Sequence, residues 1–172
     1  MRAIAGALPN NRLLQNKDAT LQSLLAALPG AGIFHFSGHA VVTAGDAALV
    51  LAAIGPDDSE RLLWASRIPR QSLRSCRLVM LAACSTGRAA SEDNDPSSAM
   101  ARAFLLTGVP EVIASRWDVD SRAASALVAQ FYRAVGQGAS AGDALALSTQ
   151  QLRWQSDFAH PYYWAAFDLF RS

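Results

Sequence analysis

The chain has 172 residues, of which 51% are hydrophobic and 17% are charged, and its formal net charge is +1. This composition excludes a disordered chain and suits one domain with a sizeable core, while the near-neutral charge and scattered arginines argue against binding of nucleic acid. No apolar run approaches the roughly 18 residues of a membrane span, and residues 1–7 lack the apolar core of a signal peptide, so we expect a cytoplasmic protein without a membrane partner.

Apolar runs and helical patterns alternate along the chain, separated by glycine, proline and small polar residues. In chain order the expected elements are a strand at 12–15, a helix at 21–28, strands at 32–37 and 47–53, a turn at 55–59, a short helix or irregular segment at 69–75, a strand at 77–83, a loop at 88–98 that could cover a site, a helix from 96 or 97 to 108, a strand at 111–115, helices at 121–136 and 140–152, and a strand at 162–169. Strands that alternate with helices predict an α/β fold with a largely parallel sheet, in one domain without an internal boundary.

Polar residues that cap helices stand at the expected helix starts. The candidate caps are Asp18 or Thr20 for the first helix, Asp120 or Ser121 for the helix at 121–136, and Ser140 for the next helix.

Two of the apolar runs end in a reactive side chain. Residues 33–39 end in His39, and residues 78–84 end in Cys84, which Ser85-Thr86-Gly87 follows. Open α/β sheets place their sites at the carboxyl ends of parallel strands, so neighbouring strands would bring His39 and Cys84 to one rim. A histidine beside a cysteine can activate the thiol as a nucleophile. The sequence therefore predicts a dyad in which His39 is the general base and Cys84 the nucleophile.

The remaining histidines and the other cysteine have structural interpretations. His35 lies within its strand, and His160 stands before a proline beside residues that pack the last strand. Cys76 is expected to be a small buried thiol, too far along the extended chain to form a disulfide with Cys84. No zinc-like spacing is present, so we expect no metal site.

Several separated motifs resemble the CHAT domain, a family of the caspase and separase group of cysteine peptidases. The segments are "FHFSGHA", "LVMLAACSTG", "GVPEVIASRWDVDSRAASALVAQFYRAVGQGASAGDALALS" and "HPYYWAAFDLF". The resemblance extends from about Asn10 to the C-terminus. It implies a caspase-like three-layer sandwich, with a mostly parallel sheet flanked by helices, and hydrolysis of peptide bonds without metal or organic cofactor. It assigns the catalytic roles to His39 and Cys84, and the backbone N–H groups of Cys84 and Ala40 to the oxyanion hole.

Two departures from the family pattern stand beside this dyad. Ala40 occupies a position that is usually glycine, and alanine would weaken catalysis if the position needs a positive φ. The family also begins with a strand and helix that are not found here, so the single CHAT domain at 1–172 is expected to be incomplete at its N-terminus. The missing first strand would lie beside the His39 strand and leave unpaired backbone groups there. A regulatory protein or a further N-terminal region would then fill the gap.

The resemblance also suggests residues that bind the substrate side chain. Ala82, two residues before the nucleophile, is one candidate, and Trp117 would either line the cleft or pack in the core. Asp118 follows Trp117 where caspases have an arginine, which would favour a basic substrate residue. The alternative is that Asp118 and Asp120 cap the following helix. A protein or peptide is the expected substrate.

We therefore predict a cysteine endopeptidase. The alternative is a catalytically silent caspase-like domain that acts through protein contacts, which Ala40 and the short N-terminus favour. A third class, a small-molecule-binding α/β domain, lacks a glycine-rich phosphate loop after its first strand.

Overall fold

A computed structural model describes residues 8, 10–43, 46–55, 61–68, 73–85 and 96–172. The predicted turn at 55–59 and loop at 88–98 lie largely outside these residues, as does the first part of the segment predicted at 69–75. The chain divides into two compact units, one of residues 1–13 and 119–169 and the other of residues 14–118 and 170–172.

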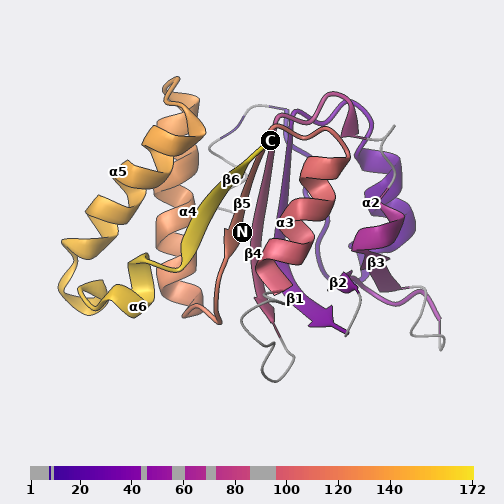
Figure 1. The fold of residues 1–172 in the computed structure, drawn as a ribbon, viewed down its shortest axis with the longest axis horizontal. Helices are drawn as coiled ribbons and strands as arrows, with labels where there is room; N and C mark the ends of the chain where they lie inside the picture. Colours follow the sequence, from indigo (N-terminus) through magenta and orange to yellow (C-terminus); the bar gives the residue numbers. More distant parts are fainter. Residues whose placement is uncertain (1–7, 9, 44–45, 56–60, 69–72, 86–95) are drawn as a thin grey trace. The chain divides into compact units, whose positions relative to one another are not determined.

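A mixed sheet of six strands confirms the predicted α/β class, with the strand order β3-β2-β1-β4-β5-β6 (Figure 1). The strands are β1 (Ile33–Val42), β2 (Ala47–Val50), β3 (Leu62–Trp64), β4 (Leu78–Ser85), β5 (Glu111–Ser115) and β6 (Phe167–Arg171). Strands β1, β4 and β5 are parallel neighbours, whereas β2 runs antiparallel to both β1 and β3. The prediction of a mostly parallel sheet therefore holds for the centre of the sheet but not for the β2–β3 side.

Helices α2 (Leu21–Ala27) and α3 (Pro96–Leu106) belong to the same unit as the strands from β1 to β5, and α3 lies along the sheet in Figure 1. The hydroxyl of Thr20 caps α2 by accepting a hydrogen bond from the N–H of Ser23 (3.1 Å). The core contains alternate residues of β1, β4 and β5, because successive side chains of a strand point to opposite faces. Phe34 of β1 packs against Phe104 of α3 with the ring centroids 5.8 Å apart.

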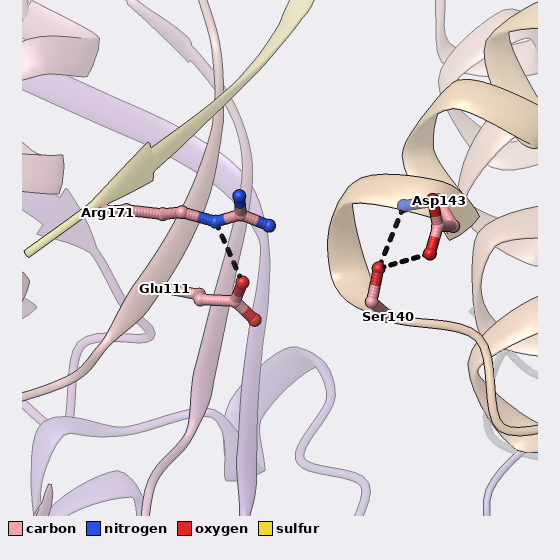
Figure 2. A network of polar contacts seen from close by, with 4 residues as sticks. All are labelled: Glu111, Ser140, Asp143 and Arg171. Atoms are coloured by element: carbon pink, nitrogen blue, oxygen red, sulfur yellow. Dashed lines mark hydrogen bonds and ion pairs between the residues drawn. The ribbon is translucent and has the colours of Figure 1, made fainter.

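The other unit contains the helices α4 (Ser121–Gly136), α5 (Ala141–Arg153) and α6 (Pro161–Trp164). The carboxylate of Asp120 caps α4, and the hydroxyl of Ser140 caps α5 by accepting from the N–H of Asp143 (3.2 Å). Figure 2 shows this cap, in which the Ser140 hydroxyl also donates to the Asp143 carboxylate (2.7 Å). The helices at these positions were both predicted, because capping residues and helical spacing are local signals.

Strand β6 is anchored next to β5 by polar contacts of its last residues. The guanidinium of Arg171 donates to the carboxylate of Glu111 at 3.0 Å, as Figure 2 also shows. The N–H of Ser172 donates to the carbonyl of Pro110 (3.3 Å).

Two predictions about elements were wrong, and one strand was missed. Residues 12–15 form no strand, and they lead into a short 3-10 helix at Asn16–Asp18. Residues 162–169 form the end of α6 and then the start of β6, because Pro161 occupies the first turn and the His160 side chain caps it by accepting from the N–H of Tyr162 (3.2 Å). Strand β3 was not predicted, and its three residues are too few to show a periodicity.

Strand β1 has a neighbouring strand on both sides over only part of its length. Strand β2 pairs with β1 from His39 to Val42, whereas β4 pairs with β1 from Ile33 to Ala40. Within the described residues, the first six residues of β1 therefore have a strand ladder only with β4. The sequence predicts that a strand is missing beside β1. This prediction concerns the side of β1 that faces away from β4, and it stays a prediction.

Candidate active site

The register of β1 and β4 brings the two predicted catalytic residues together. In this parallel pair the α-carbon of His39 lies opposite that of Cys84, and Ala40 lies opposite Ser85. Neighbouring strands of a sheet are about 4.8 Å apart, so the two backbones are within reach of a contact between side chains. The side chain of Cys84 lies outside the described part of the structure.

His39 lies inside its strand, whereas the sequence placed it at the strand exit. β1 continues to Val42 because β2 returns antiparallel beside it, with His39 opposite Val50. The connection is closed by the N–H of Thr43, which donates to the carbonyl of Asp46 (2.8 Å). The Asp46 carboxylate in turn accepts from the hydroxyl of Ser66 (2.5 Å). His39 is thus at the position where β1 gains a second neighbour.

Gly38 has a packing role in β1. A β-carbon at Gly38 would lie 2.8 Å from Cζ of Phe36, on the same face of β1. The glycine therefore lets the Phe36 ring lie over the backbone next to His39.

The two histidines of β1 differ in exposure. His35 and His39 are four residues apart on one face of the strand, and the His39 side chain is exposed whereas His35 is partly buried. Burial lowers the pKa of His35 to about 4, so its imidazole is neutral at pH 7. This agrees with a structural role for His35 and leaves His39 as the histidine of this face that solvent and a substrate can reach.

Ala40 occupies an ordinary extended position. It is 6% exposed, is not among the described residues with positive φ, and lies opposite Ser85 on one side and Leu49 on the other. An alanine is therefore unstrained here. A residue with strands on both sides directs its N–H within the sheet toward a neighbour, so this group is not aimed out of the sheet.

The comparison with protein families now decides the assignment. The sequence model of the CHAT domain matches residues 1–172. The chain belongs to the CHAT domain family. These domains are caspase-like, and the family confirms the resemblance seen in the motifs. No curated protein matches the chain.

The second cysteine of this CHAT domain is buried, as predicted. The thiol of Cys76 is 3.3 Å from the carbonyl oxygen of Leu78, and burial raises its pKa. A thiol with these properties is a poor nucleophile at neutral pH.

Of the three predicted substrate-binding residues, Ala82 lies within β4, and Trp117 and Asp118 follow the end of β5. Ala82 is half-buried on β4 opposite Ser37. Trp117 is half-buried, with the Arg116 guanidinium 5.7 Å from its ring centroid, and Asp118 is exposed. The α4 cap is Asp120, which accepts from the N–H groups of two helix residues at 2.9 and 3.0 Å.

A further polar residue at this rim was missed by the sequence analysis. The hydroxyl of Ser115, the last residue of β5, donates to the carbonyl oxygen of Ala83 at 3.0 Å. Ser115 is only 6% exposed. The signal available in the sequence was a serine that ends an apolar strand, which is too common a pattern to indicate a contact with the residue before Cys84.

Among the described residues, no group of three histidine, cysteine or acidic side chains is placed to hold a metal ion. Within the same residues, no helix has the length and apolar character that crossing a bilayer requires.

Proposed function

We propose that this CHAT domain is a cysteine endopeptidase in which His39 and Cys84 form the dyad. The observation that carries the proposal is the register that sets the α-carbons of these two residues opposite each other on parallel strands. The ladder that fixes this register joins eight consecutive pairs, from Ile33–Leu78 to Ala40–Ser85. The exposure of His39 and the buried, raised-pKa thiol of Cys76 further support Cys84 as the reactive cysteine.

The reaction follows from the chemistry of the pair. His39 takes the proton of the Cys84 thiol, and the thiolate sulfur attacks the carbonyl carbon of the peptide bond. The negative charge that develops on the carbonyl oxygen requires N–H donors, for which the backbone groups of Cys84 and Ala40 are the candidates. The imidazolium returns its proton to the leaving amine as the C–N bond breaks. Water, deprotonated by His39, then hydrolyses the thioester and restores the thiol.

The substrate in this proposal is a protein or peptide. Ala82 and Trp117 would contact the side chain that precedes the cleaved bond, and exposed Asp118 favours a basic residue there. A regulatory protein or a further N-terminal segment is the proposed partner at the β1 edge, and the cytoplasm is the proposed compartment.

A thiol-directed peptide electrophile tests the dyad. We expect it to label the wild-type protein and the Cys76→Ala variant equally and to leave the Cys84→Ala variant unlabelled. His39→Ala should slow labelling by roughly 100-fold or more, because general-base catalysis contributes on the order of 10²–10⁴. Wild-type protein that is not labelled, or Cys84→Ala protein that is, would count against a peptidase.

A catalytically silent interaction domain is the second candidate, and the position of Ala40 favours it. Ala40 has a paired strand on each side, whereas an oxyanion donor must direct its N–H at the substrate. The two candidates separate in the labelling experiment. The comparison reagent is a simple alkylating reagent with the same intrinsic reactivity as the peptide electrophile. If Cys84 of the folded wild-type protein reacts with the peptide electrophile no faster than with this reagent, the result would support the silent domain.

A further inference from the structure

We infer that Ser115 is a positioning residue that orients the backbone N–H of Cys84 toward β1. The inference rests on the proposed function and adds a residue that neither the motifs nor the dyad identifies. Its starting point is the hydrogen bond from the buried Ser115 hydroxyl to the carbonyl oxygen of Ala83 (3.0 Å).

The carbonyl of Ala83 and the N–H of Cys84 belong to one peptide group. This group is planar and trans, so its C=O and N–H point in opposite directions. The hydroxyl of Ser115 comes from β5 and holds the carbonyl toward that strand. The N–H of Cys84 is therefore directed to the other side of β4, which is the side of β1, His39 and Ala40.

The strand ladders show why a side chain is needed at this point. The β4–β5 ladder extends from Leu78 to Leu81 on β4, with Leu81 opposite Ala114 as its last pair. The β1–β4 ladder extends four residues further along β4, to Ser85. Beyond Leu81, the bond from Ser115 thus joins β5 to the backbone that leads to Cys84.

This arrangement matters when the substrate is attacked. To hold an oxyanion, the N–H of Cys84 must exchange its acceptor on the β1 side for the substrate oxygen, so the β1 strand cannot fix the peptide group during the reaction. The Ser115 bond lies on the opposite side of β4 and can keep the direction of this N–H while its acceptor changes. It also polarises the amide, because a donor to the carbonyl makes the N–H of the same group a stronger donor.

Three variants and one control test this role in the full-length protein. Ser115→Ala and Ser115→Val remove the hydroxyl, and Ser115→Thr keeps it in the shape of valine. Ser148→Ala is the matched control, because the Ser148 hydroxyl is also buried and also donates to a carbonyl, that of Ala144 (2.6 Å), in helix α5. For each protein we would measure kcat and KM on a peptide substrate, and the rate of Cys84 alkylation by iodoacetamide in a Cys76→Ala background.

We expect Ser115→Ala and Ser115→Val to lower kcat about tenfold at nearly unchanged KM, less than the 10²–10³ of a deleted oxyanion donor, because the donor is misoriented and not lost. Ser115→Thr should restore most of kcat, and Ser148→Ala should leave it unchanged. Iodoacetamide alkylation forms no oxyanion, so its rate should be the same in all proteins.

Three results would overturn the inference. A wild-type kcat in Ser115→Ala would remove the role of Ser115 while leaving the peptidase intact. An equal loss of kcat and alkylation rate in Ser115→Ala and Ser115→Val would show a general structural effect. A wild-type protein without peptidase activity or peptide-specific labelling would overturn the proposed function itself, and this inference with it. If Ser115→Ala does not fold, the comparison of the threonine and valine variants decides.

Discussion

Acidification should destabilise this protein through His35. The His35 side chain is partly buried on β1 opposite Met80, which is wholly buried, and burial lowers its pKa from 6.5 to about 4. Because the pKa is lower in the folded protein, the unfolded chain binds more protons between these two values. Stability is therefore fully present above pH 6.5 and is lost as the pH falls through the folded-state pKa near 4.

The size of the effect follows from the two pKa values. One pKa unit corresponds to about 1.4 kcal/mol, so the complete shift would amount to about 3 kcal/mol. Between pH 7 and pH 5, proton linkage through His35 gives a loss of about 2 kcal/mol in the free energy of unfolding. Partial exposure of the ring to solvent makes this an upper value.

Urea unfolding of the wild-type protein and the His35→Gln variant at pH 7 and pH 5 measures this loss, and His39→Gln is the matched control on the same face of β1. The wild-type protein and the control should each lose about 2 kcal/mol more than His35→Gln on acidification. An NMR titration should place the pKa of His35 near 4. Equal losses in wild-type protein and His35→Gln, or a His35 pKa near 6.5, would refute the argument from burial.

Two further predictions concern backbone geometry. Asp120→Ala should lower the free energy of unfolding by about 1 kcal/mol in urea unfolding, since it removes the α4 cap. Asp118→Ala should lower it by less. Equal losses of stability in the two variants would contradict the capping role of Asp120. Gly38→Ala should lower the free energy of unfolding by about 1–3 kcal/mol in the same assay, because the added β-carbon would lie 2.8 Å from the Phe36 ring. Gly32→Ala is the control, since its added β-carbon meets no atom within 4 Å. A destabilisation that is no larger at Gly38 than at Gly32 would show that Phe36 moves aside freely.

The elements that the sequence predicted well are those with local signals. Strand β5 has the predicted bounds of 111–115, since an apolar run between proline and polar residues defines both of its ends. The capping side chains of Thr20, Asp120 and Ser140 marked the three helix starts, because a cap depends only on residues two or three positions away.

The features that the sequence did not predict depend on residues far along the chain. The length of β1 depends on β2, which pairs with it from His39 onward, and no property of residues 38–42 alone extends the strand. Residues 12–15 resemble a strand in composition but have no neighbouring strand to pair with among the described residues. The hydrogen bond from Ser115 to Ala83 spans 32 positions and is visible only once β4 and β5 are adjacent.

The same long-range pairing has two opposite consequences for the candidate site. The placement of His39 opposite Cys84 was predictable because each residue ends an apolar run and the two runs form neighbouring parallel strands. The ladder that fixes this register also contains the two candidate oxyanion donors, since its last pairs are His39 with Cys84 and Ala40 with Ser85. A peptidase needs the N–H groups of Cys84 and Ala40 to exchange their acceptors in these pairs for the substrate oxygen, whereas a silent interaction domain keeps the pairs closed. The two candidate functions therefore differ in whether two ladder pairs open, and Ser115, which holds the Ala83–Cys84 peptide group from the other side of β4, is placed to keep that group oriented when they do.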